Sequence, residues 1–224
     1  MLSFVLAESA LELVPREVRG SPAVASDSKR RGVDPSGILL DRSFHHSAMA
    51  RLRDGEKRGR PDLVHAALLS VAGTPLYLDG GAKVFVHTYP DLVLEIAEKT
   101  RLPKNYVRFR GLMEKALSEK PQDGLVGVKQ MGMSELVRKE IRPDLVVGLS
   151  VRGKEAGMEG LASRVASAEH PCLVVGGFPH GHFSEKLTSV LDDLVRIDPR
   201  PLEAHVVAAR VVYEIEKALK SIND

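Results

Sequence analysis

The stretch Glu56–His65, EKRGRPDLVH, places arginines on both sides of a glycine and an aspartate two residues after the second arginine. Guanidinium groups bind phosphates and carbonyls through paired hydrogen bonds. A carboxylate beside them can accept a proton from a bound substrate. The order therefore indicates a site that grips an anion and removes a proton, with Arg60 and Asp62 as candidates. The structural alternative is that Asp62 only favours the dipole of a helix that begins here.

Basic residues are concentrated in three groups, although the formal net charge is only +2. Residues 99–110 hold five Lys or Arg and no acid, residues 51–60 hold five diluted by two acids, and Lys29, Arg30 and Arg31 form the third group. Basic groups in a nearly neutral chain favour a one-sided surface for a polyanion. The alternative is three separate solvated faces.

The length of 224 residues fits a single α/β domain with an ordinary apolar core. The only cysteine, Cys172, excludes an internal disulfide and fits a reducing compartment, which we take to be the cytoplasm. No apolar run is long enough to cross a bilayer, and the first residues lack a basic leader, so we expect no membrane partner.

The first half of the chain alternates between predicted strands and helices. Residues 19–37, rich in Gly, Ser, Pro and charge, are predicted to be a mobile loop that orders on a ligand. Residues 75–100 are predicted to be a small inserted β segment. The patterns predict strands at 2–7, 83–88 and 90–96, a short helix at 11–14, and helices at 41–52, at 62–71 and from Pro103 onward.

Two segments in the last third share one pattern: RPDLVVGLSVRG at 142–153 and HPCLVVGGFPHGHF at 170–183. Each has a fully apolar run followed by glycine, which is typical of parallel strands covered on both faces. Glycine beyond the carboxyl end lets the backbone approach a ligand, and two such ends form a binding crevice. Residues 155–168 are predicted to be the crossover helix, and residues 201–222 the final helix.

Several known motifs are absent, including the P-loop, the dinucleotide fingerprint and the G-x-S-x-G elbow. His180 and His182, with Cys172 upstream, match no common structural zinc spacing, so we predict no metal site. The loop Gly176–Gly181, GGFPHG, can wrap an adenosine-like ligand through its backbone groups. A purely structural turn explains the loop equally well.

The chain resembles the pseudouridine N1-specific RNA methyltransferase family of the SPOUT class, which acts in small-subunit ribosome assembly. The resemblance covers most of the chain and rests on LLDRSFHHSAM (39–49), KRGRPDLVH (57–65), VFVHT (84–88), RLPKNYVRFRGLM (101–113), GGFPHG (176–181) and PLEAHVVAARVVYEIE (201–216). It implies an α/β, SPOUT-type parallel sheet flanked by helices. It also implies a deep trefoil knot in residues 142–224, S-adenosyl-L-methionine as cofactor, and a homodimer.

The resemblance also implies roles for individual residues. Asp62 would act on the N1 proton, and Arg60 would hold a phosphate or base carbonyl. The RNA-binding residues would be Arg58, Arg60, Arg101, Lys104 and Arg108. The cofactor-binding residues would be Gly148, Ser150, Gly153, Gly176, Gly177, Phe178, Pro179, His180, Gly181, Ile197, Pro201, Leu202 and Ala204. His182, Glu203 and Lys104 depart from the residues that we expect in this family, which affects single contacts and not the cofactor's identity.

The function implied is N1-methylation of a pseudouridine in small-subunit (16S-type) ribosomal RNA during ribosome biogenesis, with ribosomal assembly proteins as further partners. Two alternatives stay open. One is a non-enzymatic factor that binds ribosomal RNA. The other is a SPOUT methyltransferase that acts on transfer RNA.

Overall fold

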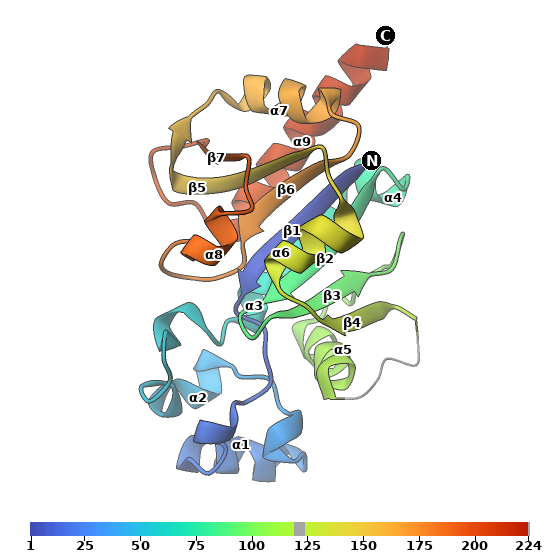
Figure 1. The fold of residues 1–224 in the computed structure, drawn as a ribbon. Helices are drawn as coiled ribbons and strands as arrows, with labels where there is room; N and C mark the ends of the chain where they lie inside the picture. Colours follow the sequence, from blue (N-terminus) through green and yellow to red (C-terminus); the bar gives the residue numbers. More distant parts are fainter. Residues whose placement is uncertain (119–123, 224) are drawn as a thin grey trace.

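The computed structural model describes residues 1–118 and 124–223. Within them, one seven-stranded mixed sheet has the strand order β4-β3-β2-β1-β6-β5-β7 (Figure 1). Neighbouring strands from β2 to β7 in this order are parallel, whereas β3 pairs antiparallel with both β2 and β4. The strands are β1 (Leu2–Ser9), β2 (Ala82–Thr88), β3 (Leu92–Ile96), β4 (Val126–Gln130), β5 (Leu145–Glu155), β6 (Pro171–Gly176) and β7 (Asp193–Arg196).

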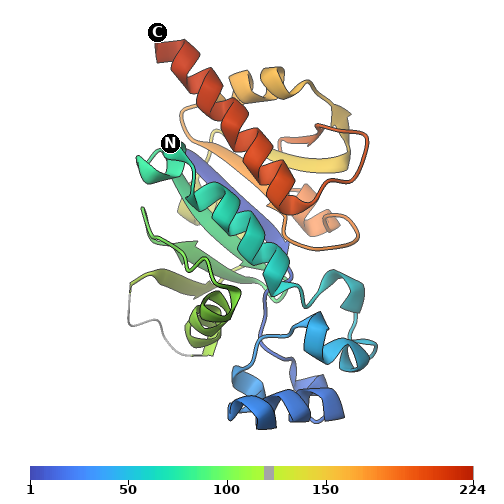
Figure 2. The same ribbon diagram turned by 180° about the vertical axis from the view of Figure 1, so that it is seen from behind.

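The apolar runs became strands covered on both faces, as predicted. In central strand β1, Phe4 and Leu6 pack into one core, while Val5 and Ala7 pack into another on the opposite face. Successive side chains of a strand point to opposite faces, so a continuous apolar run is stable only where both faces are buried. Figure 2 shows α3 and α9 side by side on one face, and Figure 1 shows α6 on the other.

The helices follow the predicted order, with additions. Those at 41–52, 62–71, 155–168 and 201–222 and the one after Pro103 are confirmed as α2, α3, α7, α9 and α5. The helices are α1 (Pro22–Arg31), α2 (Arg42–Met49), α3 (Pro61–Ala72), α4 (Pro75–Leu78), α5 (Tyr106–Ser118), α6 (Met133–Glu135), α7 (Met158–Ser167), α8 (Glu185–Thr188) and α9 (Ala204–Asn223). Short 3-10 turns lie at Arg16–Val18, Pro35–Gly37 and Gly55–Lys57, and Leu136–Ile141 forms a π-helix. No helix in the described ranges is long and apolar enough to cross a membrane.

The prediction of a mobile loop at 19–37 was wrong, because α1 occupies most of it. Ser21 accepts a hydrogen bond from the Val24 N–H at the start of the helix, and Pro22 stands at its first position. Gly32 ends the helix at φ 63°, a left-handed conformation that favours glycine. Polar composition masked these start and stop signals.

Two further predictions need correction. Residues 11–14 are extended and not helical, since Leu13 forms a β-bridge with Leu39 and the Val14 N–H bonds to Ile38. The segment 75–100 is not a separate insertion, because β2 pairs in parallel with central strand β1. Only its outer strand, β3, turns antiparallel, and β4 extends that edge.

Candidate functional site

A cavity of about 150 Å³ lies beside the middle of β5 and the carboxyl end of β6. Nine of the predicted cofactor residues line it: Ser150, Gly176, Phe178, Pro179, Gly181, Ile197, Pro201, Leu202 and Ala204. They come from the middle of β5, from the end of β6 and the loop after it, and from the segment after β7, three adjacent strands. A crevice is therefore present beside the two predicted parallel strands, and the segment after β7 adds a third wall.

The other four predicted cofactor residues lie outside this wall. A Cβ on Gly148 would be 2.5 Å from Leu191, and one on Gly153 would be 2.5 Å from the backbone of Val195, so both glycines allow close packing beside β5. Gly177 likewise packs against Ser9, at the end of β1. His180 lines a second cavity of about 630 Å³. The predicted cofactor contacts of these four stay untested.

Asp198 and Arg200 also line the first cavity, and the sequence analysis did not single them out. Arg200 donates hydrogen bonds to Asp198 from its backbone and its guanidinium, at 2.9 to 3.1 Å. These bonds and the positive charge lower the pKa of Asp198 to about 2. The cavity wall therefore carries an ionised carboxylate paired with Arg200, in addition to its apolar side chains. The signal in the sequence was the run Asp198-Pro-Arg200-Pro201 directly after a short apolar strand.

Ala10 connects the glycine loop to the segment that carries Arg60. Its N–H donates to the Gly177 carbonyl at 2.8 Å, and its carbonyl accepts from the Arg60 N–H at 3.1 Å. The Gly177 N–H in turn donates to Ala7 at 2.8 Å. The end of β1 thus holds both segments of the predicted site through backbone bonds.

Gly59 forms the turn between Arg58 and Arg60. It has φ 66°, and a Cβ there would lie 2.7 Å from Met49. On one side of this turn Arg58 points inward and is 8% exposed. Its guanidinium donates to both oxygens of Glu12, at 2.7 and 2.6 Å. This placement does not fit the RNA contact predicted for Arg58, because a buried arginine bonded to a carboxylate is not available to a phosphate.

Arg60 and Asp62 form the close pair that the motif predicted. Arg60 Nε and Nη2 donate to the two oxygens of Asp62 at 2.8 Å each, and the side chains are 35% and 49% exposed. Burial alone would raise the pKa of Asp62, but the hydrogen bonds and charge of Arg60 outweigh it and lower that pKa. Asp62 is also in the first turn of α3, so the helix-dipole role coexists with the pair.

The segment that carries Arg101, Lys104 and Arg108 is fixed to α3. His65 Nε2 donates to the Pro103 carbonyl at 2.7 Å, and the His65 ring stacks on Phe109 with centroids 4.2 Å apart. The three cations are exposed, and within the described residues none has a carboxylate partner. They are free to bind an anion near the start of α3.

Tyr106 bonds to Asp41, the residue that precedes α2. Its hydroxyl donates to Asp41 Oδ2 at 2.6 Å, while Asp41 Oδ1 accepts the Ser43 N–H and caps α2. Burial and the negative charge of Asp41 raise the pKa of Tyr106, so the phenol stays protonated. Asp41 therefore links the start of α2 to the start of α5.

Lys57 connects the basic segment with the cavity wall. Its ammonium forms an ion pair with Glu8, donates to the His182 carbonyl at 2.7 Å, and lies 4.2 Å from the centre of the Phe178 ring. Glu8 also accepts the Ser184 N–H at 3.1 Å. The loop 178–184 is therefore held by side chains from two distant segments. The sequence analysis did not single out Lys57 or Glu8.

A mixed α/β sheet with this cavity, an Arg–Asp pair and three exposed cations is an arrangement that suits an enzyme acting on an anionic substrate. Residues 4–216 match the family model described as EMG1/NEP1 methyltransferase. The chain belongs to this methyltransferase family.

Relatives match along nearly the whole chain. "Ribosomal RNA small subunit methyltransferase Nep1" of Staphylothermus marinus is 39% identical over 220 residues, which cover 96% of this chain and 95% of the relative. The protein of that name from Pyrococcus furiosus is 38% identical over 218 residues, 96% of each chain. The crystal structure of Archaeoglobus fulgidus Nep1 bound to S-adenosylhomocysteine has a TM-score of 0.85 and 36% identity, and the match covers 96% of this chain and 97% of that one.

Proposed function

We propose that this chain transfers a methyl group from S-adenosyl-L-methionine to N1 of a pseudouridine in small-subunit ribosomal RNA, during ribosome biogenesis. Its membership of the methyltransferase family supports the reaction class, and the names of its relatives support the RNA. The observation that carries the proposal is the Arg60–Asp62 pair, tied through Ala10 to the loop that lines the cavity.

The cavity residues fit the proposed cofactor. Its wall combines apolar side chains, including Leu149, Ile197 and Leu202, with glycines that leave backbone groups open. Such a wall suits a nucleoside base, and the carboxylate of Asp198 suits a hydroxyl or positively charged group. A homologue bound to S-adenosylhomocysteine supports the same ligand here. When bound, S-adenosyl-L-methionine supplies an electrophilic methyl group on a positively charged sulfur.

The residues of the chain would prepare the RNA nucleotide for attack. Pseudouridine carries a proton on ring N1, which must leave before or during methylation. Asp62, ionised at neutral pH because its pKa is lowered, can hydrogen-bond to that N–H and accept its proton. Arg60 can stabilise negative charge that develops on the ring or hold a phosphate. For this, the Arg60–Asp62 pair must open or rotate toward the base.

Arg101, Lys104 and Arg108 would bind the flanking RNA backbone. Their side chains are exposed and have no carboxylate partner among the described residues, and their segment is bonded to α3, which supports this role. Binding through such contacts weakens as salt rises, because each neutralised phosphate releases counterions. The target base leaves its stack to reach the pair, as in other enzymes that act on a base.

The proposal includes two further features of the protein. One is the deep trefoil knot in residues 142–224, and the other is a homodimer formed near α9. The family resemblance supports both. Sedimentation of the full chain tests the dimer: a mass of one chain at micromolar concentration would contradict it.

The direct test combines cofactor binding and methyl transfer. Calorimetric titration with S-adenosylhomocysteine is followed by mass analysis of RNA hairpins that carry uridine or pseudouridine. We expect binding, and one added methyl group on the pseudouridine hairpin alone. Cofactor binding without transfer to either hairpin would favour a non-enzymatic assembly factor or a transfer RNA substrate.

A further inference from the structure

The α1–α2 unit carries a basic face that plays no part in the site above. We define the α1–α2 surface by Lys29, Arg30, Phe44 and Arg51, all exposed. Residues 19–58 contain nine Lys or Arg against five Asp or Glu. None of the four residues lines either cavity described above. The unit has a small core of its own, so this face is not needed to complete the main core.

Two acids of this unit are buried and three are exposed. Asp27 and Asp41 are buried, and they bind Arg30, Arg31 and Tyr106, whereas Asp34, Asp54 and Glu56 are exposed. Within the described part of the chain, Lys29 and Arg51 are exposed and have no carboxylate partner. Arg30 pairs with Asp27 but remains 59% exposed. These three side chains therefore place positive charge at the α1–α2 surface.

Phe44 adds an aromatic ring to the same face. It is 39% exposed, whereas His45, Ala48 and Met49 of the same helix are buried. The guanidinium carbon of Arg30 lies 4.6 Å from the ring centre. Unpaired RNA bases stack on aromatic rings and on guanidinium planes, and the neighbouring phosphates need cations. The exposed Phe44 ring beside the exposed Arg30 guanidinium, in a unit with further exposed cations, combines both requirements.

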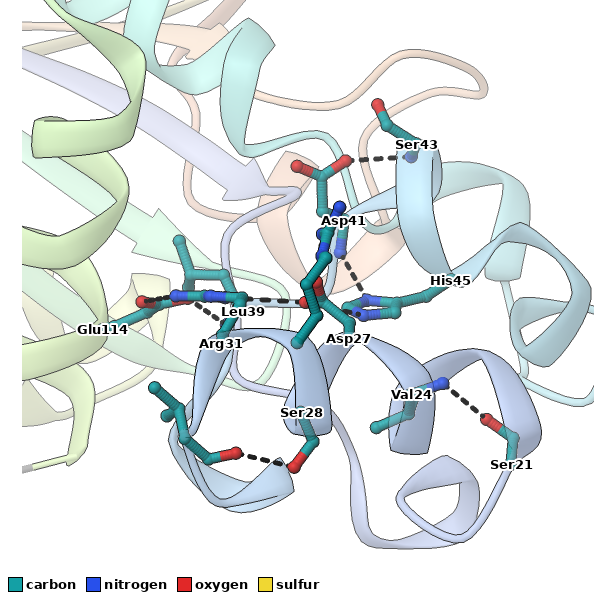
Figure 3. A network of polar contacts seen from close by, with 12 residues as sticks. Ser21, Val24, Asp27, Ser28, Arg31, Leu39, Asp41, Ser43, His45 and Glu114 are labelled. Atoms are coloured by element: carbon teal, nitrogen blue, oxygen red, sulfur yellow. Dashed lines mark hydrogen bonds and ion pairs between the residues drawn. The ribbon is translucent and has the colours of Figure 1, made fainter.

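Buried ion pairs fix this surface relative to the rest of the molecule (Figure 3). Arg31 donates two hydrogen bonds to Glu114 of α5, and Glu114 also accepts the Leu39 N–H at 3.0 Å. Asp41, three residues before Phe44, binds Tyr106 at the start of α5. The helix that follows the Arg101–Lys104 segment therefore also supports the α1–α2 unit, so one RNA can contact both at fixed positions.

We propose that the α1–α2 surface is a second RNA contact, in which Phe44 stacks on an unpaired base and Lys29 and Arg51 bind adjacent phosphates. The inference rests on the proposed function, since it takes RNA as the substrate. The charge favours RNA over a protein partner, because the Phe44 ring lies beside the Arg30 guanidinium, and Lys29 and Arg51 are further exposed cations of the same unit.

The first test measures binding of the full chain to a fluorescein-labelled RNA hairpin with an uridine-rich loop, by fluorescence anisotropy. Phe44→Leu keeps an apolar side chain and removes the ring, whereas Phe44→Tyr keeps the ring. We expect F44L to weaken binding about tenfold and F44Y to stay within about twofold of the unmodified chain. Equal binding by all three proteins would overturn the stacking role.

The second test uses salt. Lys29→Gln with Arg51→Gln should reduce the slope of log affinity against log salt by about 1 to 2, measured between about 50 and 300 mM salt. Arg138→Gln is the matched control, because Arg138 is also exposed and lies in the turn that follows α6. An unchanged slope in the double variant, or an equal change in R138Q, would contradict a specific contact here.

Methyl transfer by the unmodified chain separates this inference from the proposed function. If that chain methylates the pseudouridine hairpin while F44L and the double variant bind RNA as it does, only the α1–α2 contact fails, and a protein partner becomes the better candidate for this face. If the RNA affinity depends on Phe44 but no methyl transfer occurs, the contact stands and the proposed function fails.

Discussion

Gly177 and Arg60 hydrogen-bond to opposite sides of one residue. The Gly177 carbonyl accepts from Ala10, and the Arg60 N–H donates to Ala10, at 2.8 and 3.1 Å. The loop that lines the cavity and the segment that carries the Arg60–Asp62 pair therefore move with the end of β1. A change in the Gly177 loop should therefore alter the position of the Arg60 segment, and the reverse.

Gly177→Ala tests this coupling. A Cβ at Gly177 would lie 2.1 Å from Ser9 Oγ and 2.9 Å from Leu6 Cγ, so the loop or β1 must shift. We expect a loss of stability of about 1–3 kcal/mol, measured by urea unfolding. Calorimetry should show S-adenosylhomocysteine binding weakened by about tenfold or more, equivalent to ~1.4 kcal/mol.

Gly160→Ala is the control, since nothing lies within 4 Å of the added methyl group in α7. There we expect a gain in stability of about 0.5–1 kcal/mol and unchanged ligand binding. If G177A bound the ligand as tightly as the unmodified chain, the coupling through Ala10 would be wrong.

Asp62→Asn removes the proposed proton acceptor and keeps its shape. We expect turnover to fall about 10²- to 10⁴-fold, with unchanged affinity for S-adenosylhomocysteine, because Asp62 does not line the cavity. Asp79→Asn, at an exposed carboxylate that follows α4, should leave turnover unchanged. Turnover of D62N equal to that of D79N would remove the base role.

The pH profile of the unmodified chain offers a second check on Asp62. Because Arg60 lowers the pKa of Asp62, its carboxylate is ionised throughout the range from about pH 5 to 8. Turnover should therefore show no rising limb from Asp62 in this range. A rise near pH 6 that disappears in D62N would mean that the pKa is raised when RNA is bound.

Glu114→Gln should destabilise the chain strongly. Glu114 and Arg31 are mostly buried and pair through two hydrogen bonds, so loss of the carboxylate leaves a buried guanidinium without its charge partner. We expect a loss of about 2–4 kcal/mol in the free energy of unfolding. Lys129→Met breaks the exposed Lys129–Glu140 pair and should cost less than about 1 kcal/mol. Similar losses in the two variants would contradict the supporting role of the Arg31–Glu114 pair.

His45 should make stability depend on pH. The ring is fully buried; its Nδ1 accepts the Asp41 N–H, and its Nε2 lies 3.5 Å from Asp27. Burial lowers the pKa of His45, although Asp27 and Asp41 act in the opposite direction. Below an ordinary histidine pKa of about 6.5 the unfolded chain therefore binds a proton that the folded chain does not, so stability falls as the pH drops.

Urea unfolding at pH 7.5, 6.5 and 5.5 measures this effect. Each histidine of this kind contributes at most about 1.4 kcal/mol per pH unit, and His87, whose pKa burial also lowers, should add to the slope. His45→Gln should reduce the slope of the unfolding free energy against pH by the contribution of one proton. This holds whatever the overall stability of the variant. An identical slope in H45Q and the unmodified chain would show that His45 is protonated to the same degree in both states.

The sequence by itself determined the features that depend on neighbours along the chain. The apolar runs in β1, β5 and β6 indicated buried strands, and the glycines that end the apolar runs of β5 and β6 predicted a crevice beside them. Arg60 and Asp62 are two residues apart at a helix start marked by Pro61, so their pairing was also local. Backbone steric preferences and the periodicity of apolar residues act within a few residues. The structures that depend on them can therefore be predicted from the sequence.

Only the tertiary structure decided the features that depend on distant partners. Arg58 is buried because Glu12, 46 residues away, accepts hydrogen bonds from its guanidinium. The sequence motif alone assigned both Arg58 and Arg60 to RNA binding. Lys57 binds Glu8 and the His182 carbonyl, and Asp41 binds Tyr106. The spacing of these residues along the chain does not predict the contacts. A polar side chain takes whichever partner the packed core brings to it, and that choice is made by the whole fold.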